Sequence, residues 1–284
     1  MELYQIYNPI TASPFMCNES YMEWEPCEAL KPYIKCFWGT SKPVKQAKTD
    51  ISTRGIVTPD TCMDIIFNVD FMNNRISGRF CGIDDRTFVT NNKNDEERFT
   101  ATFAIRFYAW SAVMFSEESM RDVRNGFFDA GYHFARIKKE LEPLLFDMTG
   151  MAEFISIAES VLIKNFHENR ENAYVIEAVG QILKSKGKLR AESLAKEIHI
   201  SNRQLERLFR EYIGVSPKNL ASMMRYQYLW NDILYARQFD VQDAVYRYGY
   251  TDQAHLLHEF KKFHSMNITE AKRYALKDVA FLQV

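Results

Sequence analysis

Histidine is absent from the first 132 of the 284 residues. The chain also has no Cys-x-x-Cys pair, although it contains five cysteines, all in its first third. A metal centre with imidazole ligands needs clustered histidines and a carboxylate, and a cysteine-only zinc site needs paired spacing. The sequence therefore predicts no metal site in its N-terminal half, and it shows no motif for a cofactor. The cysteines are Cys17, Cys27, Cys36, Cys62 and Cys81.

Two further absences concern export and membranes. The N-terminus, Met1 to Gln5, has no basic start followed by an apolar run, and no stretch approaches 18 uncharged apolar residues. The sequence thus predicts neither a signal peptide nor a membrane span, and we expect a cytoplasmic protein. In a reducing compartment the cysteines are expected to be free buried thiols, with a thiol sensor as the alternative.

Charge is distributed unevenly along a chain whose net charge is only −1. Residues 175–284 contain 17 basic and 12 acidic residues, a balance of +5, whereas the rest contains 19 and 25, a balance of −6. A basic part joined to an acidic part is typical of a polyanion-binding module attached to a second module. The length also fits two domains better than one.

The first part of the chain shows a strand pattern. Segments 33–38, 63–69 and 99–107 are rich in β-branched and aromatic residues, with turn-prone stretches between them. Several short strands at near-regular spacing predict a small barrel or a sandwich. From about Ser116 the apolar residues follow helical spacing, and these helices are expected to cap the barrel or to form a dimer interface. The charged stretch 165–172 is the predicted linker.

The last part of the chain predicts helices alone. One helix begins near Val175 and stops at Gly187, and a short helix covers 191–198. Ser216-Pro217 opens a long helix to about Tyr235, with proline in the first turn, where its missing N–H is not needed. Further helices are expected at 241–248 and 270–276, with a glycine turn at Gly249.

Two segments in this region, Ser201–Arg210 and Thr251–Phe263, repeat one pattern. Each starts with helix-capping residues, and Ser201 with Gln204 fits a capping box. Each keeps an apolar face, with basic or polar residues nearly opposite. The apolar faces consist of Leu205, Leu208, Phe209 and Tyr212 in the first segment and of Leu256, Phe260 and Phe263 in the second.

A short helix and a tight turn before each segment predict two helix-turn-helix units, in which the second helix enters the major groove of DNA. A helix from Pro217 to Tyr235 would be about 28 Å long, close to the ~34 Å between successive major-groove faces. One chain could then place both recognition helices in adjacent grooves. The alternative for either segment alone is an amphipathic surface helix with a solvated basic face.

Residues 175–276 resemble the DNA-binding domain of the AraC/XylS family of transcription regulators. The resemblance rests on a set of motifs spread over this region: Leu194-Ala195, Ser201-x-Arg203-Gln204-Leu205-x-Arg207-Leu208-Phe209, Gly214-x-Ser216-Pro217, Arg225, Gly249-Tyr250 and Phe260-Lys261-Lys262-Phe263. It implies sequence-specific binding to double-stranded promoter DNA and regulation through RNA polymerase. Base contacts are implied for Arg203, Glu206 and Arg207 in one groove and for Gln253, His255 and His258 in the next.

The full set of predicted DNA contacts extends this list. Side chains expected at the DNA are Asn202, Arg203, Glu206, Arg207, Arg210, Gln253, His255, His258, Lys261 and Lys262, and backbone contacts are expected from Ser201, Ser216, Lys218 and Thr251. The chain departs from the family pattern at Val245, where alanine is usual, and at Leu256-Leu257-His258, where Phe-Ser/Thr-Arg is usual. Leu257 could contact a thymine methyl group. A structural role is the alternative for His255.

The segment Ile56–Asn68, with Pro59-Asp60-Thr61-Cys62-x-Asp64, resembles sensor-like domains attached to some AraC-type regulators, and Ile105-Arg106-Phe107 fits them too. This implies a small cupin-like β-barrel, in which an apolar pocket for an unknown small-molecule effector is expected. The candidate ligand residues are Trp24, Trp38, Asp64, Phe67, Phe103, Arg106, Phe107 and Trp110. Ordinary core packing is the alternative for the aromatic residues.

The sequence therefore predicts an α+β protein of two domains. Residues 1–115 form a small cupin-like β-barrel, 116–170 a helical dimerisation or linker segment, and 171–284 an all-α domain with two helix-turn-helix units joined by a linker helix. The main hypothesis is an effector-modulated DNA-binding regulator, not an enzyme, which could act as a homodimer. The alternatives are a barrel with enzymatic activity on a small molecule and a barrel that binds a protein partner.

Overall fold

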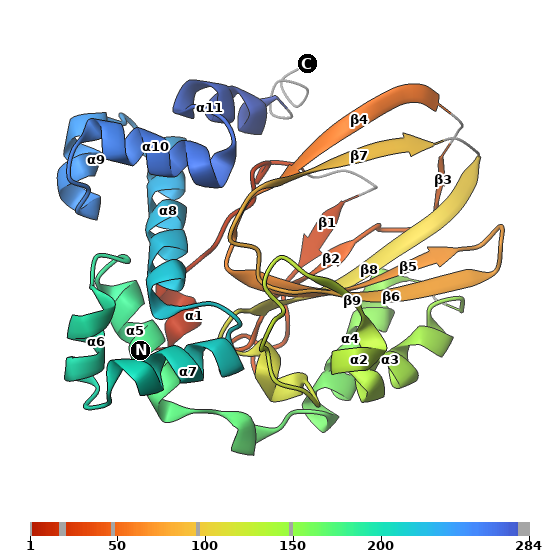
Figure 1. The fold of residues 1–284 in the computed structure, drawn as a ribbon. Helices are drawn as coiled ribbons and strands as arrows, with labels where there is room; N and C mark the ends of the chain where they lie inside the picture. The colour runs from red at the N-terminus through yellow and green to blue at the C-terminus, as the bar shows by residue number, and fades with distance from the viewer. Residues whose placement is uncertain (1, 17–20, 47–48, 95–96, 148–149, 278–284) are drawn as a thin grey trace.

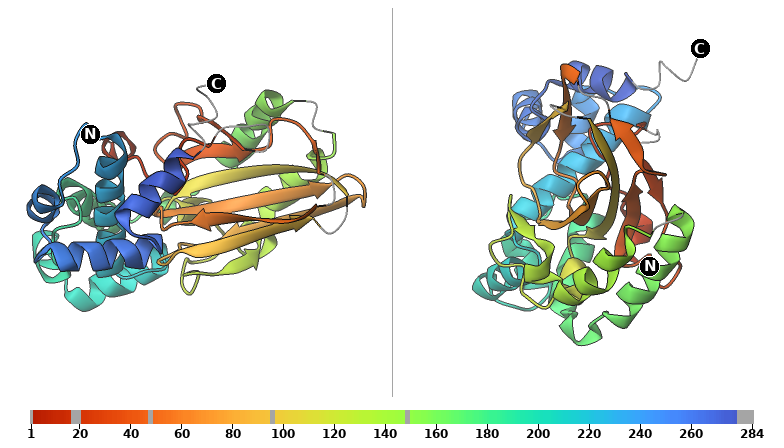
Figure 2. Two further views of the ribbon diagram at one scale, coloured as in Figure 1. Left: turned by 90° about the horizontal axis from the view of Figure 1, so that it is seen from above. Right: turned by 90° about the vertical axis from the view of Figure 1, so that its right-hand side faces the viewer.

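The computed structural model describes residues 2–16, 21–46, 49–94, 97–147 and 150–277. They form an N-terminal antiparallel β-domain and a C-terminal helical domain, which confirms the predicted fold class (Figure 1). Seen from above, the two domains lie side by side (Figure 2). Within the part of the chain that is described, no helix is long and apolar enough to cross a membrane.

The β-domain contains two antiparallel sheets. In the larger sheet the order is β1-β2-β8-β5-β6-β9, with β3 also paired to β8, and β4 pairs with β7 in the smaller sheet. The three predicted strands are β2, β5 and β8, which are neighbours at the centre of the large sheet. The strands are β1 (Met22–Trp24), β2 (Ile34–Gly39), β3 (Val44–Gln46), β4 (Thr49–Val57), β5 (Cys62–Asp70), β6 (Arg75–Cys81), β7 (Phe88–Asn94), β8 (Arg98–Tyr108) and β9 (Phe127–Asp129).

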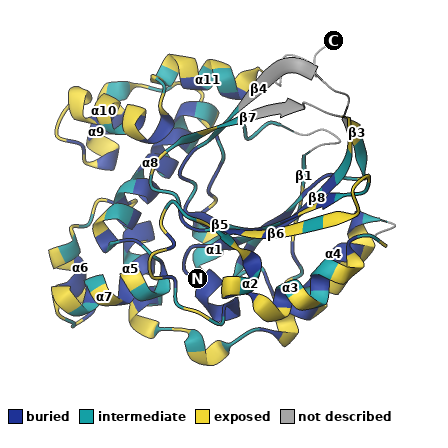
Figure 3. Ribbon diagram, turned by 45° about the vertical axis from the view of Figure 1, so that its right-hand side comes forward, coloured by how far each residue is buried: buried dark blue, intermediate teal, exposed yellow. Residues whose placement is uncertain are grey.

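The large sheet has one face covered by helices and one face turned toward β4 and β7 (Figures 1 and 3). Phe67 is paired with Phe103 across β5 and β8, so both side chains lie on the same face. There Phe103 packs edge-on against Phe154, with ring centroids 4.7 Å apart. The covering helices are α2 (Ala130–His133), α3 (Ala135–Leu141) and α4 (Met151–Lys164). The segment 116–170 therefore caps the sheet, and its role in a dimer stays a prediction.

The helical domain follows the predicted boundaries closely, because most of its ends are capped by recognisable side chains. Helix α11 begins two residues earlier than predicted, since Asn267 and Glu270 form a capping box. The sequence interpretation also missed α1 (Leu3–Ile6), a single turn. The other helices are α5 (Ala173–Lys184), α6 (Ala191–Glu197), α7 (Asn202–Tyr212), α8 (Pro217–Tyr235), α9 (Val241–Tyr248), α10 (Gln253–His264) and α11 (Ile268–Leu276).

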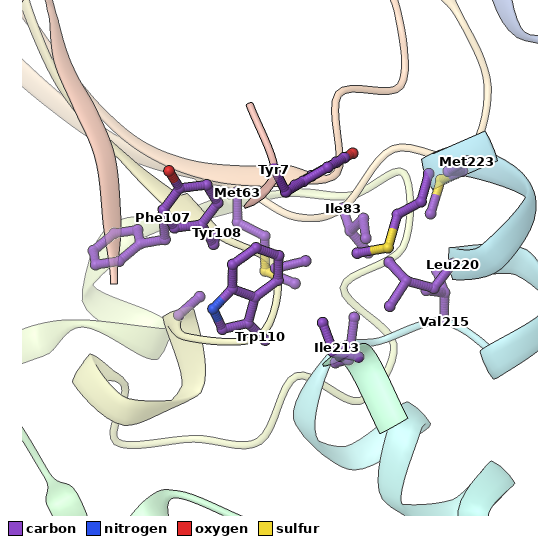
Figure 4. Close-up of a cluster of buried hydrophobic side chains, with 14 of the residues drawn as sticks. Tyr7, Met63, Ile83, Phe107, Tyr108, Trp110, Ile213, Val215, Leu220 and Met223 are labelled. Carbon is purple, nitrogen blue, oxygen red and sulfur yellow. The ribbon is translucent and has the colours of Figure 1, made fainter. Parts of the chain in front are cut away.

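The two domains share one continuous hydrophobic core. Figure 4 shows Ile83 of the β-domain beside Leu220 and Met223 of the helical domain, with Trp110 and Tyr108 in the same buried cluster. The segment 165–172, the predicted linker, is held against the β-domain: the Arg170 guanidinium donates to the Ser116 carbonyl at 2.7 Å. The domains are thus not loosely tethered modules.

Residues 2–16 lie against the helical domain rather than in the sheets of the β-domain. The Ile10 amide donates to Gln227 Oε1 at 2.8 Å, and Gln227 Nε2 donates to the carbonyls of Ile10 and Pro59 at 3.1 and 2.7 Å. Trp230 Nε1 donates to the Thr11 carbonyl at 3.0 Å. Because Gln227 and Trp230 lie on α8, this N-terminal arm is fastened to the middle of the long helix.

A fully buried histidine, His264, ends α10. Its ring stacks on Phe260 with centroids 5.1 Å apart, and its Nδ1 lies 2.8 Å from the Tyr226 hydroxyl. Burial lowers the pKa of His264 to about 4, from an ordinary value of 6.5. The folded protein therefore keeps this ring neutral at pH values where the unfolded chain has already protonated it.

This shift predicts that the free energy of unfolding falls as the pH is lowered from about 6.5 to about 4, by roughly 3 kcal/mol from this residue. Only the unfolded chain binds the extra proton in that window. Urea denaturation at a series of pH values measures the effect, with His264→Gln as the comparison. His133, whose pKa burial also lowers, titrates in both proteins, so their difference isolates His264. Parallel pH profiles would contradict the prediction.

Candidate nucleic-acid interface

The two helix-turn-helix units are built on the same turn. After α6, His199 adopts a left-handed conformation (φ 58°) and the Ile200 amide donates to the Ala195 carbonyl at 3.0 Å. After α9, Gly249 adopts it (φ 68°) and the Tyr250 amide donates to the Val245 carbonyl at 3.0 Å. These are the hydrogen bonds of a Schellman helix end, repeated 50 residues apart. The likeness of the two segments therefore extends from sequence to backbone geometry.

Each recognition helix starts at a side-chain cap. Ser201 Oγ accepts from the Gln204 amide at 3.2 Å, and Asp252 Oδ1 accepts from the His255 amide at 2.7 Å. The return bond of the expected capping box at Ser201 is not formed among the described residues. One accepted bond is enough to satisfy a free amide in the first turn and fix where the helix begins.

Helix α7 presents the predicted basic stripe to solvent. Leu205, Leu208 and Phe209 are buried, whereas Asn202, Arg203, Arg207 and Arg210 are exposed and Glu206 is half-buried. Arg207 is partly engaged within the helix, 3.6 Å from Glu211. Arg203 and Arg210 form no ion pair within the described part of the chain, so their guanidinium groups are free for an external acceptor.

Helix α10 shows the same division. Leu256, Phe260 and Phe263 are buried, and the predicted contacts Gln253, His255, His258, Lys261 and Lys262 are all exposed. Leu257 is 44% exposed, but it lines a hollow with Phe239 and Val241 next to α9. This places Leu257 on the flank of the helix instead of in the exposed basic stripe.

The contacts of His255 with neighbouring residues favour a structural role for this side chain. Its Nδ1 accepts from the Thr251 amide at 3.3 Å, and its ring lies edge-on to Tyr250 with centroids 5.3 Å apart. Its Nε2 is 4.0 Å from Glu259. The imidazole therefore helps to shape the start of α10, while its edge stays accessible.

An ion pair fixes α10 on α8. Arg225 of α8 donates from Nη2 to both carboxylate oxygens of Glu259 at 2.7 and 2.8 Å, and from Nε at 3.1 Å. Both side chains are only 14% exposed, and the guanidinium lies 4.5 Å from the centroid of the Tyr250 ring. This forked geometry constrains the orientation of the second recognition helix.

Helix α8 sets the separation of the two units. It has 19 residues, about 28 Å at 1.5 Å per residue, and α7 and α10 lie at its opposite ends (Figure 1). At its start, Ser216 Oγ accepts from the Asn219 amide at 3.1 Å, so this predicted DNA-backbone residue is used as a helix cap. Lys218 and Thr251 are exposed.

Two clefts on α7 contain arginines that sequence reasoning missed. A cleft of about 460 Å³ is lined by α7 and the α7–α8 turn on one side and by a β-domain loop on the other. A second, of about 670 Å³, joins Arg121 of that loop to Ser201, Arg203, Gln204 and Arg207. No local motif marks this loop, because its position depends on a contact between distant segments. The first cleft is lined by Arg121, Asp122, Arg124, Arg207, Arg210, Gly214, Val215, Ser216 and Asn219.

The eight candidate ligand residues do not share one surface, which corrects the expectation of a single pocket. Trp24, Phe67, Phe103 and Phe107 lie on the helix-covered face of the sheet, because strand register pairs them with residues of that face. Trp110 stacks on Tyr108, with centroids 4.6 Å apart, in the core between the domains (Figure 4). Sequence alternation alone could not decide which face is covered.

The other three candidates meet on the face turned toward β4 and β7. Arg106 Nε donates to Asp64 Oδ1 at 2.9 Å, and Trp38 Nε1 donates to the same oxygen at 2.7 Å. Arg106 is also 3.8 Å from Asp60 and 3.9 Å from Glu23. Burial, followed by the charges of Asp60 and Asp64, raises the pKa of nearby Asp84 to about 7. The face is thus polar and acidic around one arginine.

The cysteines of the described residues are free thiols. Burial raises the pKa of Cys36 to about 12 and that of Cys62 well above its ordinary value. These thiols are therefore protonated and poorly reactive near neutral pH. Cys17 lies outside the described residues. No group of three or more potential metal ligands occurs among the described histidines, cysteines, aspartates and glutamates.

Residues 194–274, from α6 into α11, match a family described as a helix-turn-helix domain. This part of the chain is an AraC-type helix-turn-helix domain. It includes both units and the linker helix α8. Residues 22–129 match a domain of unknown function (DUF6597), which covers β1 to β9. No curated protein sequence matches the chain.

Several solved structures are similar. ToxT from Vibrio cholerae is 14% identical, with 83% of this chain and 98% of that chain covered and a TM-score of 0.41. ToxT bound to (E)-4-(8-methylnaphthalen-1-yl)but-3-enoic acid is 12% identical, with 84% and 99% covered and a TM-score of 0.38. An AraC-type regulator from Chromobacterium violaceum is 20% identical over 37% of this chain and 94% of that chain, with a TM-score of 0.34.

The Arg225–Glu259 pair predicts that Arg225→Met lowers the free energy of unfolding by about 3–5 kcal/mol, because it leaves a buried carboxylate without its partner. Urea denaturation measures this loss. Arg247→Met is the matched control on an exposed pair with Asp232 and should cost at most about 1 kcal/mol. Replacing both partners, in Arg225→Met with Glu259→Leu, should restore much of the stability. Equal losses for Arg225→Met and Arg247→Met would refute the assignment.

Proposed function

We propose that the chain is a cytoplasmic transcription regulator that binds promoter DNA sequence-specifically, with α7 and α10 in adjacent major grooves. The observation that supports this most strongly is the pair of like helix-turn-helix units at opposite ends of one rigid helix. Two recognition helices on one chain can contact two successive groove faces without a second subunit.

The exposed side chains on the two helices suit different bases. Arg203 and Arg207 can donate bidentately to guanine, Glu206 can accept from cytosine, and Gln253 can pair with adenine. His258 supplies a further donor or acceptor in the second groove. Lys261, Lys262 and Lys218 suit phosphates, and Ser201 and Thr251 lie at the helix starts where backbone contacts are usual.

The β-domain is proposed to bind a small-molecule effector that modulates DNA binding. Support comes from the half-buried cluster of Trp38, Asp64 and Arg106, whose charges and hydrogen-bonding groups suit a polar ligand rather than an aliphatic one. The same proposal includes assembly into a homodimer and regulation of transcription through RNA polymerase.

Selection from a pool of randomised duplexes tests the DNA-binding function. The wild-type protein should enrich a motif with two parts centred about 10–10.5 base pairs apart. Arg203→Ala with Arg207→Ala should abolish preference in one part only, at about 1–3 kcal/mol for each base contact, and Gln253→Ala with His258→Ala should do so in the other. Fluorescence anisotropy on the selected duplex and on a shuffled one measures each loss.

A charge-matched variant away from both helices, Arg75→Gln with Arg98→Gln at the far edge of the β-domain, should leave the preference unchanged. If the wild-type protein enriches no motif, the proposed function is excluded. Loss of both parts of the motif in either helix variant would instead exclude independent recognition by the two helices.

The effector proposal predicts that a ligand on the polar face quenches or shifts the fluorescence of Trp38. Titration with panels of amino acids, sugars and organic acids measures the change, and Trp38→Phe should remove it because the indole lies within hydrogen-bonding distance of Asp64. A signal that survives in Trp38→Phe and disappears in Trp110→Phe would place the ligand in the core between the domains and contradict the proposed site.

A further inference from the structure

The β-domain places two arginines beside the first recognition helix. The loop 120–124 is anchored there by buried Met120 and Val123, and the Met120 amide donates to the Glu211 carbonyl of α7 at 2.8 Å. Its other side is exposed and carries Arg121 and Arg124. The spacing of the buried and exposed residues therefore presents both guanidinium groups to solvent.

Gly214, in the turn between α7 and α8, permits this close approach. Its φ is +86°, and a Cβ at this position would lie 2.8 Å from the Met120 carbonyl oxygen and 2.8 Å from a methyl group of Val123. Any other residue would be strained and would push the loop away. The α7–α8 turn, through Gly214, and the loop, through Met120 and Val123, are thus both shaped for this contact.

A second set of bonds holds the base of the loop. Asp85 Oδ2 accepts from Asn219 Nδ2 of α8 at 2.8 Å, and Asp85 Oδ1 accepts from Asn125 Nδ2 at 2.7 Å. Arg124 Nη1 lies 3.4 Å from Asp85 Oδ2. Asp85 therefore links the loop, the β-domain and the start of α8 through one carboxylate.

The arginines form a continuous band because the two clefts share Arg121 and Arg207. We define this arginine band as Arg203, Arg207 and Arg210 of α7 with Arg121 and Arg124 of the loop. The acidic groups beside the band are Glu206 in α7 itself, Asp122 in the cleft, Asp85 beside Arg124 and Glu211 beside Arg207. The five guanidinium groups exceed these four carboxylates, and Arg121, Arg203 and Arg210 form no ion pair among the described residues.

The exposure of the band indicates its occupant. The side chains of Arg207 and Arg124 are 61% and 55% exposed, so the band is an open surface rather than an enclosed site for a small anion. A guanidinium group matches the geometry of a phosphate and can bind it bidentately. The first turn of α8 borders the same cleft and adds a weak positive potential.

We propose that Arg121 and Arg124 bind backbone phosphates of the same duplex whose major groove receives α7, so that the β-domain forms part of the DNA interface. The inference rests on the proposed DNA-binding function and adds a contact surface from the other domain. It explains why the loop is fixed against α7 with both charges outward. The contacts would be independent of sequence because they reach phosphates only.

The test is the salt dependence of binding by the full-length protein carrying Arg121→Gln and Arg124→Gln. Each phosphate interaction that the substitutions remove should reduce the slope of log K against log salt by about 0.9, so the slope of the double variant should be shallower by up to about 1.8. Affinity should fall by the same factor on the selected duplex and on a shuffled duplex. Arg75→Gln with Arg98→Gln removes equal charge elsewhere and should change the slope far less.

Several outcomes would overturn the proposal. An unchanged slope in the loop variant, with Arg203→Ala still losing base preference, would leave the DNA-binding function intact and exclude the phosphate contacts. Tighter binding by the loop variant would show that the loop obstructs α7. Thermal stabilisation by inorganic pyrophosphate that the loop variant loses, with no change in the DNA slope, would assign the band to a small anion. If the wild-type protein prefers no duplex, the proposed function itself fails.

Discussion

The buried amide of Gln227 holds the structure together at its centre. Its side chain is 2% exposed and bonds at once to both backbone groups of Ile10 and to the carbonyl of Pro59. The N-terminal arm, the loop before β5 and the helix between the two recognition helices therefore meet at one side chain. A residue without an amide here would leave buried backbone groups unsatisfied, at a cost of about 1–3 kcal/mol for each group.

The two recognition helices and the β-domain are all attached around helix α8, which carries Gln227. Helix α7 leads into the start of α8 through the turn at Gly214, and Arg225 in the middle of α8 holds α10 through Glu259. The β-domain contacts the same helix through the arm and contacts α7 through the loop 120–124. Hydrogen bonds thus join the linker helix to the N-terminal arm and to the loop before β5, and α7 to the loop 120–124, while the Arg225–Glu259 pair joins α10 to the linker helix.

Local signals made much of this predictable from sequence. Ser216 and Pro217 mark the start of α8, Gly249 marks the turn before α10, and the apolar spacing in α7 and α10 separates buried from exposed residues as observed. The central strands were recognisable because β2, β5 and β8 are paired on both sides and need β-branched and aromatic residues. In each case the determining residues are close together in the chain.

What could not be predicted depends on contacts between distant segments. The alternation in β8 shows two faces but does not say that Phe103 and Phe107 face helices while Arg106 faces β4 and β7. A four-residue helix such as α1 has almost no intrinsic stability and forms because the arm packs against the helical domain. Arg121 and Arg124 gain their importance only from the docking of their loop beside Gly214.

The shared core also limits how the chain can be divided. Ile213, Val215, Leu220 and Met223 of the helical domain are buried partly by residues of the β-domain (Figure 4). A fragment holding only residues 171–284 would turn this apolar surface to water and leave Gln227 without its partners. Such a fragment would be prone to self-association, so its poor solubility would reflect the severed interface rather than a defect in the helices themselves.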